Sequence, residues 1–365
     1  MPEMKCGQAV IASVLNHGVD TVFGIPGGQT YELFDALYDE AHRVNLVTSR
    51  HEQGAAYMAF GYAQATGRVG VYTVVPGPGV LNTMAALSTA YARNAPVLCL
   101  AGQVPLHAVG RGIGYLHDVP DQSGVLERIT KWTGFIAKPE EAADKVAMAF
   151  RQLRTGRSRP VALEIPPDVL AQRVEITLPA PETSYPPAAP DPDRIEQAAQ
   201  LLAGARRPMI YIGGGAVDAG SELLALAKLL QAPVVSQRGG RGVIDDRSCF
   251  SQTYPAGHRL WPQVDVVLAV GTRLKYPRLH WGTDAGLSII HIDIDAAELN
   301  RISEPTVPVH GDAKLSVGAL VTALEKIIKS RESREEELSA LKNSMRAQFE
   351  QVQPQLAYLD VIRRE

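Results

Sequence analysis

The sequence is poor in cysteine. Its 365 residues contain three, at Cys6, Cys99 and Cys249, and no C-x-x-C pair. An odd number of widely spaced cysteines argues against a disulfide framework or a zinc site and fits a reducing compartment. No apolar run reaches the ~18 residues that a membrane span needs, and the N-terminal segment lacks a signal-peptide pattern. We therefore expect a cytoplasmic protein that has no membrane as a partner.

An excess of charge of one sign is also missing. Lys and Arg number 36 against 39 Asp and Glu, which leaves a net charge of −3 at pH 7. This balance gives no electrostatic reason to expect nucleic acid as a partner. The sequence contains no H-E-x-x-H, G-x-S-x-G or Walker A pattern and no G-x-G-x-x-G. We expect no metal site in this chain, and few of its side chains are arranged for chemistry of their own.

What the sequence does contain is an alternation of helical and strand patterns in two blocks. In the first block, β-rich runs lie at 20–25, 44–49, 69–75, 96–102 and 160–166, between helical patterns at 7–17, 30–40, 52–66, 80–92 and 140–153. In the second, strand candidates at 208–215, 232–237, 264–272 and 287–295 alternate with helical patterns at 194–203, 220–230 and 313–329. Such alternation predicts α/β domains with parallel sheets covered by helices on both faces.

A proline-rich stretch separates the two blocks. Residues 178–193, LPAPETSYPPAAPDPD, carry six prolines and read as a semi-rigid linker. The fold predicted is two doubly wound parallel-sheet domains, each a three-layer α/β/α arrangement. We place the N-terminal domain at 1–177, the linker at 178–193, the central domain at 194–345 and a lead-in to a further domain at 346–365.

One acid stands at the start of a helix built from small residues. Glu52 opens the pattern of 52–66, in which Ala55, Ala59 and Ala63 share a face that Gly54 and Gly61 thin further. Such a face would allow a close approach by another backbone. Acids are also favoured in a first helical turn by the helix dipole alone. Glu52 is therefore either a functional carboxylate or a plain helix-start signal.

Two turns rich in Gly and Pro, GIPGG at 24–28 and VPGPG at 75–79, each follow a β-rich run and precede a helix. In a parallel sheet these turns lie at the carboxyl edge, where α/β proteins bind ligands. Glycine permits close backbone approach and proline stiffens the turn, although strand-to-helix turns often carry both for geometry alone. The long loop at 104–124 contains His117-Asp118, a candidate substrate contact.

The second block has its own glycine turn, GGGAVDAG at 213–220, followed far along the chain by HIDID at 291–295. The spacing misses the dinucleotide fingerprint, because Asp218 stands where the third glycine belongs. A nucleotide-type site and a tight turn without a ligand both remain open for this segment.

The motifs occur in an order that resembles the thiamine-diphosphate enzyme superfamily, and most closely its acetolactate-synthase-like branch. The N-terminal set is GVDTVFGIPGG, RHEQGAAYMAFGYAQATGRVGV, PGPGVLNTMAALSTAYARNAPVLCLAGQVP, DQSGVLERITKW and RPVALEIPPDV. The second block is similar to the central domain of that family, through IGGGAVDAG, LLQAPVVSQRGGRGVI, VDVVLAVGTRL, IIHIDIDAAELNR and VHGDA.

The resemblance implies that thiamine diphosphate carries the difficult chemistry, so that the protein mainly activates the coenzyme. Glu52 matches the glutamate that hydrogen-bonds N1′ of the aminopyrimidine, a role for which we expect it to be shielded from water. The pyrimidine end would be lined by Pro26, Gly27, Gly28, Pro76, Gly77, Pro78, Gly79 and Asn82. Gln103, His117 and Gln122 would face the substrate, a small-molecule 2-keto acid.

The sequence departs from the family pattern at several points. The G-D-G…N motif, which in the family holds Mg2+ and the diphosphate, is not present, and Pro76 stands before GPG where relatives more often have Ser or Thr. The paired histidines of the pyruvate-decarboxylase branch are missing, which disfavours simple decarboxylation. Some members of the branch hold FAD in the central domain. The residues in suitable places for FAD are Arg157, Gly213, Gly214, Gly215, Gly271 and Arg273.

The resemblance thus predicts the pyrimidine-binding and central parts of a carboligase or lyase that acts on a 2-keto acid. It implies a homodimer or tetramer through the N-terminal domain, and we expect this chain alone to be inactive. Two alternatives stay open: a non-catalytic nucleotide-binding or assembly module, and a 2-keto acid decarboxylase of the same superfamily.

Overall fold

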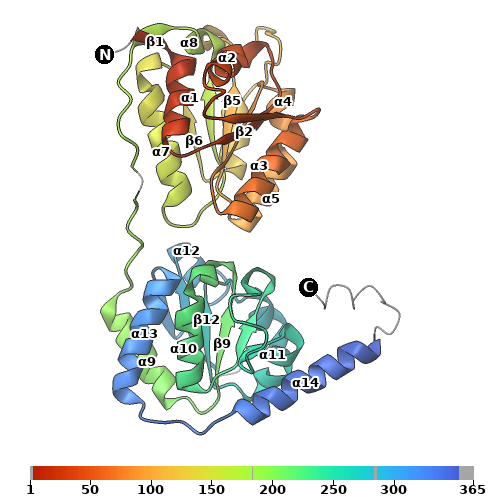
Figure 1. Cartoon of the computed structure of the whole chain (residues 1–365), viewed down its shortest axis with the longest axis vertical. Helices are drawn as coiled ribbons and strands as arrows, with labels where there is room; N and C mark the ends of the chain where they lie inside the picture. The colour runs from red at the N-terminus through yellow and green to blue at the C-terminus, as the bar shows by residue number, and fades with distance from the viewer. Residues whose placement is uncertain (1–2, 183, 283–285, 353–365) are drawn as a thin grey trace. The chain divides into compact units, whose positions relative to one another are not determined.

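The computed structural model describes residues 3–182, 184–282 and 286–352 (Figure 1). The chain divides into two compact units, Met1–Pro186 and Pro187–Glu365. The division falls within the proline-rich stretch 178–193, whose described residues form no strand and enter a helix only at Pro192. Proline cannot donate a backbone hydrogen bond, so this composition keeps the stretch out of either sheet.

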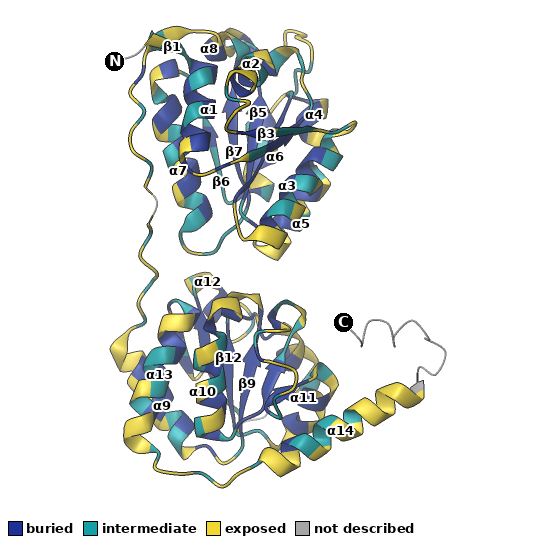
Figure 2. Ribbon diagram, in the orientation of Figure 1, coloured by how far each residue is buried: buried dark blue, intermediate teal, exposed yellow. Residues whose placement is uncertain are grey.

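The N-terminal unit is built on a six-stranded sheet in which every neighbouring pair is parallel. All residues of its three central strands β4, β5 and β7 are buried (Figure 2), which explains their continuous apolar runs. The order across the sheet is β3 (Asn45–Thr48), β2 (Thr21–Gly24), β4 (Gly70–Val74), β5 (Val97–Gly102), β7 (Val161–Ile165) and β6 (Trp132–Phe135).

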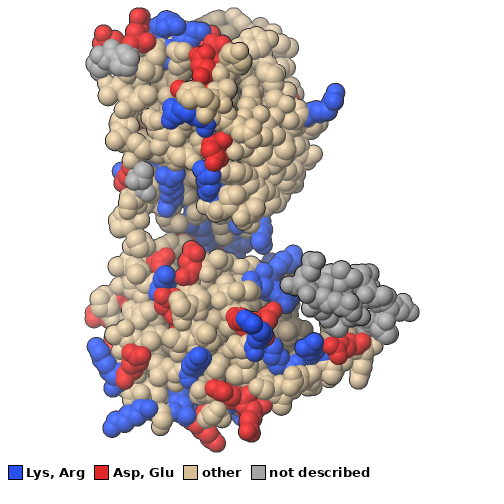
Figure 3. Space-filling view, viewed as in Figure 1, with Lys and Arg blue, Asp and Glu red and all other residues tan. Residues whose placement is uncertain are grey.

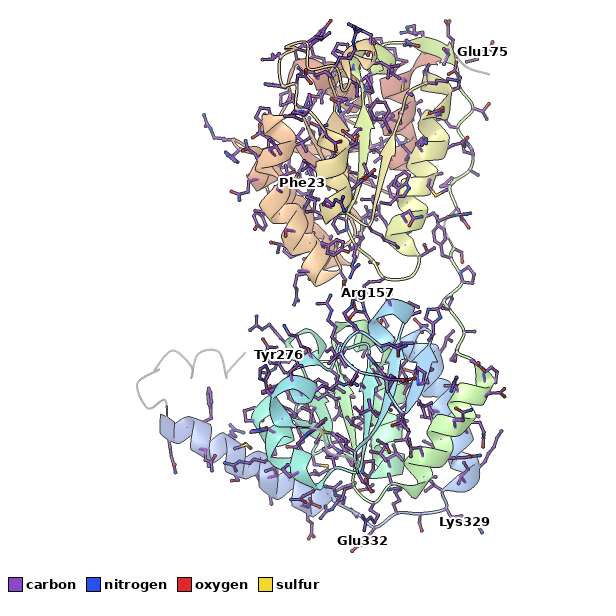
Figure 4. The ribbon with its side chains drawn as sticks, turned by 180° about the vertical axis from the view of Figure 1, so that it is seen from behind. Phe23, Arg157, Glu175, Tyr276, Lys329 and Glu332 are labelled. Atoms are coloured by element: carbon purple, nitrogen blue, oxygen red, sulfur yellow. The ribbon has the colours of Figure 1, made fainter. Side chains whose placement is uncertain are left out.

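Helices cover both faces of this sheet (Figure 1), and each face has its own apolar core. One core is formed with α1 (Cys6–Asn16), α2 (Tyr31–Asp39) and α7 (Ala142–Arg154). The other is formed with α3 (Glu52–Thr66), α5 (Met84–Arg93) and α6 (Gln122–Ile129). Phe23 of β2, labelled in Figure 4, belongs to this second core, where its ring meets that of Tyr62 edge-on. The unit therefore has the predicted three-layer α/β/α arrangement.

The strand order creates a switch point between β2 and β4. From β2 the chain moves outward to β3, and it then returns to place β4, β5 and β7 on the other side of β2. The connections after β2 and β4 therefore diverge to opposite faces of the sheet, and the carboxyl edge at such a switch point is the usual ligand site of open α/β sheets.

Helix α3 lies unusually close to the sheet because small residues meet there. Ala55, Ala59 and Ala63 are buried against the strands, and a side chain at Gly70 of β4 would overlap the carbonyl oxygen of Ala59. The backbone that approaches this alanine face closely is therefore that of β4 in the chain's own sheet. The chain's own sheet already occupies it, because burying apolar alanines on apolar strands removes both surfaces from water.

The central unit repeats this architecture. Its six parallel strands run in the order β11 (Ser251–Gln252), β10 (Val234–Ser236), β9 (Pro208–Ile212), β12 (Val266–Val270), β13 (Ser288–Asp293) and β14 (Val307–His310). Helices α9 (Pro192–Gly204), α10 (Gly220–Leu230) and α13 (Ala313–Ile327) cover one face, and α11 (Tyr254–Leu260) packs with α14 (Glu335–Val352) on the other (Figure 1). The switch point lies between β9 and β12.

Several elements were not predicted. The edge strands β6, β11 and β14 are short, and β14 contains a proline; a two-stranded antiparallel ribbon joins β1 (Glu3–Lys5) to β8 (Arg173–Glu175). The pattern predicted as one helix at 80–92 is broken at Thr83 into α4 (Pro78–Asn82) and α5. Helix α14 runs through the boundary placed at 345/346, and 353–365 lie outside the described residues. No helix in the described ranges is long and apolar enough to cross a membrane.

The contact between Gly70 and Ala59 yields a stability prediction. Gly70→Ala should destabilise the N-terminal unit by about 2–3 kcal/mol, because its methyl group has to push α3 off the sheet. Gly61→Ala is the matched control: no atom lies within 4 Å of the added methyl group on this helical position. It should stabilise the unit by roughly 0.5–1 kcal/mol. Hydrogen exchange of the β4 amides measures both, and equal effects would contradict the close-packing argument.

Candidate functional site

The predicted turns meet at the carboxyl edge of the N-terminal sheet. GIPGG follows β2, VPGPG follows β4, and β2 and β4 are neighbours in the sheet. The two turns touch, because a side chain at Gly27 would overlap that of Val75. Val75 also packs beside Gly79, so its side chain fills the space between the two turns. Gly28 lies open, because no atom stands within 4 Å of the place that a Cβ would take there.

Glu52 reaches the same edge from the adjacent strand β3. His51 caps the helix, its Nδ1 accepting a hydrogen bond from the Gln53 backbone N–H at 3.2 Å, which makes Glu52 the first residue of α3. The Asn82 side-chain amide donates to Glu52 Oε2 at 2.9 Å. In the described ranges no hydrogen bond reaches the other oxygen, Oε1. The carboxylate is half-buried rather than enclosed as expected, because the first turn of α3 lies at the rim of the unit.

The break between α4 and α5 places Asn82 for this contact. Asn82 ends α4, and Thr83 turns the chain while its hydroxyl donates to the Val80 carbonyl at 2.7 Å. The buried hydroxyl of Tyr72 donates to Thr83 in turn, at 3.0 Å. The two predicted site residues Glu52 and Asn82 are thereby brought together from positions thirty residues apart.

The PGPG turn has a conformation that only glycine adopts without strain. Gly77 has φ 57° and ψ −116°, and the Gly79 N–H donates to the Pro76 carbonyl at 3.3 Å, which defines a type II′ turn. A side chain at Gly77 would also overlap the carbonyl of His117. Pro78 then begins α4 at a position where proline loses no helical hydrogen bond.

The loop after β5 closes over this turn. Gln29, next to GIPGG, donates to the Leu116 carbonyl at 3.0 Å, and His117 has a positive φ of 68°. The Oε1 atom of Gln29 and the Nδ1 atom of His117 are buried and have no hydrogen-bond partner among the described residues. Unsatisfied buried polar atoms are costly, so two of them beside one turn indicate a place where a polar ligand group could bind.

Gln103 and Gln122, predicted to face the substrate, are instead buried in the unit. The amide nitrogens of both donate to Glu164 Oε1, at 3.0 and 2.8 Å. Gln122 Oε1 accepts the Gly77 backbone N–H at 2.7 Å. Glu164 is fully buried, and this burial raises the pKa of its carboxyl, against which hydrogen bonds from Ser123, Gln122 and Gln103 act. Gln122 therefore supports the PGPG turn from behind, and Gln103 bonds the same Glu164 oxygen that holds Gln122.

Glu164 and Gln29 were not predicted as site residues. A signal for Glu164 was present, since it is an acid inside the otherwise apolar strand run PVALEIP, and such residues are rarely buried without a role. Gln29 carried no comparable signal, because an exposed-type residue after a glycine turn is ordinary. Among the described residues, no group of three or more His, Cys, Asp or Glu side chains is placed to hold a metal ion.

The glycines of the central unit pack against each other. Side chains at Gly213 and Gly271 would overlap the opposing backbone, and one at Gly215 would lie 2.9 Å from the Cα of Gly271. Arg273 is paired with the buried Glu298, its Nε lying 3.4 Å from Oε2. The close approach of the two connections explains these three glycines without a ligand. Gly214 and Gly215 are both exposed, but of these three positions and Gly214 only Gly214 has room for a side chain.

Arg157 lies at the opposite edge of the N-terminal sheet from the turns GIPGG and VPGPG. It lies in the connection from α7 to β7, at the amino edge of the N-terminal sheet, whereas GIPGG and VPGPG follow the carboxyl ends of their strands. Figure 4 shows Arg157 and Glu175 at opposite ends of this unit. Glu175 belongs to β8, which follows the carboxyl end of β7.

Two models of known protein families match the chain. The N-terminal TPP binding domain of thiamine pyrophosphate enzymes matches residues 4–125, and the central domain of the same enzymes matches residues 195–320. The chain belongs to the thiamine pyrophosphate enzyme family, of which it carries these two domains. Thiamine pyrophosphate is the same compound as thiamine diphosphate.

The chain is also similar to individual enzymes. The chain is 36% identical over 328 residues to a probable 2-ketoarginine decarboxylase of Pseudomonas aeruginosa, with 88% of this chain and 58% of the relative covered. It is 35% identical over 366 residues to a probable acetolactate synthase large subunit of Methanocaldococcus jannaschii, covering 93% and 59%. An acetolactate synthase of Arthrospira platensis is 34% identical over 334 residues, covering 86% and 57%. The chain thus spans less than two thirds of these relatives.

The strained turn gives the test of this geometry. Gly77→Ala should lower the free energy of unfolding of the N-terminal unit by about 3 kcal/mol, the sum of a disfavoured backbone conformation and the overlap with His117. Gly110→Ala is matched to it, since Gly110 also has a positive φ, of 72°, but no neighbour within 4 Å. It should cost only about 1–2 kcal/mol. Urea unfolding monitored by hydrogen exchange measures the free energy of unfolding of both variants. Equal losses would mean that the His117 contact does not form.

Proposed function

We propose that the N-terminal unit holds the aminopyrimidine end of thiamine diphosphate at the carboxyl edge of the sheet, at the switch point between β2 and β4. One observation carries this proposal: Glu52 and two glycine turns come from three adjacent strands to the same carboxyl edge. The chain spans less than two thirds of these relatives, so its activity, substrates and partners are proposals.

The residues at this edge fit a flat polar ring. Gly28 offers backbone without a covering side chain, so a ring can lie close to it. Among the described residues no hydrogen bond occupies Glu52 Oε1, and Oε2 is already fixed by Asn82. The unsatisfied Gln29 Oε1 and His117 Nδ1 add an acceptor and a second ring nitrogen at the same edge. Pro26, Pro76 and Pro78 stiffen the turns around that space.

When bound, thiamine diphosphate supplies the carbon nucleophile and the electron sink for cleavage next to a carbonyl group. The chain's part is to hold a proton at one atom. Glu52 Oε1 would form the hydrogen bond to N1′ of the pyrimidine, and that bond would favour the tautomer whose exocyclic nitrogen acts as the internal base. Asn82 holds the other carboxylate oxygen, so that Glu52 keeps one rotamer. No other side chain of the chain is needed as a base.

We further propose that the enzyme acts as a carboligase or lyase on a 2-keto acid. The acetolactate synthases among the relatives support this reading. The relative named as a 2-ketoarginine decarboxylase, at 36% identity, supports the alternative of a 2-keto acid decarboxylase. His117, which lies over Gly77, is the residue of this chain best placed to meet the substrate. We propose a cytoplasmic location from the low cysteine content.

The proposed enzyme is a homodimer or tetramer formed through the N-terminal unit. The outer surface of α3 and α5 supports this, because Glu52 and Arg93 are the only charged residues of these two helices. In Figure 3 the side of the unit formed by α3 and α5 shows few charged side chains. Tyr57, 39% exposed, offers an aromatic ring on this surface. Surfaces depleted in charge and carrying aromatic rings are typical of subunit interfaces.

FAD is the less supported cofactor. The glycines at 213, 215 and 271 have a packing reason of their own, and Arg273 is engaged with Glu298. Only the exposed Gly214 retains an argument from geometry for a nucleotide at the central switch point. The alternative of a nucleotide-binding or assembly module therefore depends on this one position.

Binding of the pyrimidine can be tested without the rest of the enzyme. In the 365-residue chain, the aminopyrimidine alcohol of thiamine should shift the NMR amide signals of Gly28 and Gly77, with weak, roughly millimolar affinity for so few atoms. Glu52→Gln, which cannot supply the same proton at Oε1, should weaken binding about tenfold. Glu127→Gln, an exposed acid on α6, should leave it unchanged. Shifts confined to Gly213–Gly215 would instead favour the nucleotide-binding module.

The whole coenzyme should bind this chain poorly. We propose that Mg2+ and the diphosphate are held by the family's G-D-G…N domain, whose motif does not occur in these 365 residues. Calorimetry with Mg2+ and thiamine diphosphate should then give an affinity no better than that for the pyrimidine alone, and no turnover of pyruvate. Tight binding that requires Mg2+ would contradict this assignment.

A further inference from the structure

A single buried carboxylate connects three segments at the candidate site. Glu164 lies near the end of β7 with 0% of its surface exposed. Its Oε1 accepts from Gln103, which follows β5, and from Gln122, the first residue of α6. Its Oε2 accepts from the hydroxyl of Ser123. Every polar atom of the Glu164 carboxylate is therefore hydrogen-bonded, as burial of a charged group requires.

The carboxylate decides which way the Gln122 amide points. The nitrogen of that amide donates to Glu164 Oε1 at 2.8 Å and to the Gly102 carbonyl at 3.0 Å. Rotated by half a turn, its oxygen would face these two acceptors, and its nitrogen would face the Gly77 N–H, a donor. Both contacts would then be repulsive, so Glu164 and Gly102 select one orientation.

This orientation is the one that satisfies the PGPG turn. Gln122 Oε1 accepts the Gly77 N–H at 2.7 Å, on the buried side of the turn. On the other side, the His117 carbonyl closes over the Gly77 Cα. We propose that Glu164 is a positioning residue for the candidate site: through Gln122 it fixes the Gly77 peptide, and with it the turn that leads into α4 and Asn82. The functional meaning of this role depends on the proposed pyrimidine site.

A general structural role makes a different prediction from this positioning role. If Glu164 only stabilised the unit, its loss would speed hydrogen exchange throughout the sheet. If it positions the turn, the loss concentrates at Gly77, because that N–H loses an acceptor held in place. Ser123→Ala is the matched control, since it removes the contact at Oε2 and leaves the Gln122 side untouched.

The experiment measures amide exchange by NMR in the 365-residue chain, with the β5 amides as the internal reference. Glu164→Met and Gln122→Met should each speed exchange at Gly77 by about tenfold or more relative to β5, the value of one lost buried hydrogen bond. Glu164→Gln keeps an acceptor for both glutamines and should restore protection to within about threefold, as should Ser123→Ala. Glu164→Asp, which keeps the charge but withdraws the oxygens, replaces Glu164→Met if that variant does not fold, and should match it.

Unchanged Gly77 protection in folded Glu164→Met or Glu164→Asp would overturn the inference, as would equal acceleration at Gly77 and β5. Titrating the same variants with the aminopyrimidine alcohol of thiamine separates this result from the proposed function. Selective acceleration at Gly77 without any pyrimidine binding would support Glu164 as the positioning residue of the turn and count against the pyrimidine site. No change at Gly77 together with intact binding would have the opposite meaning.

Discussion

The parallel order of the N-terminal strands is the constraint on which the site depends. Because every strand of the sheet points the same way, each connection that leaves a carboxyl end emerges at one edge. Glu52, GIPGG and VPGPG lie far apart in the sequence, yet β3, β2 and β4 are consecutive in the sheet. Hydrogen bonding between backbones thus gathers the candidate residues at one edge before any side chain contributes, at the switch point between β2 and β4.

Side-chain hydrogen bonds then fix the candidate residues that the sheet brings together. Asn82 restrains Glu52 from the front, and the Glu164 network holds the PGPG turn from behind. The two supports differ in kind. The first is at the rim, where water competes for each hydrogen bond, and the second is in the interior, where an unpaired group is expensive. A site made this way has one adjustable contact, which faces the ligand, and a fixed foundation, which does not.

The fold was largely predictable, since long apolar strands and well-capped helices carry their signal locally. Helix α3 has the predicted bounds, Glu52–Thr66, and β4 and β5 lie within their predicted runs. The short strand β6 and helix α6 were missed, because few residues leave little periodicity to detect. The directions of Gln103 and Gln122 could not be predicted either. They depend on Glu164, more than forty residues further on, and only the strand pairing of β5 with β7 makes that proximity visible.

The close packing of α3 on β4 affects the position of the Glu52 carboxylate. Glu52 is the first residue of α3, and the distance of this helix from the strands is set by the contact of Ala59 with Gly70, two helical turns away. A larger side chain at Ala59 or Gly70 would move the first turn of α3 outward, and Glu52 would move with it. Substitutions at Ala59 and Gly70 would therefore change the position of the Glu52 carboxylate while keeping the glutamate itself.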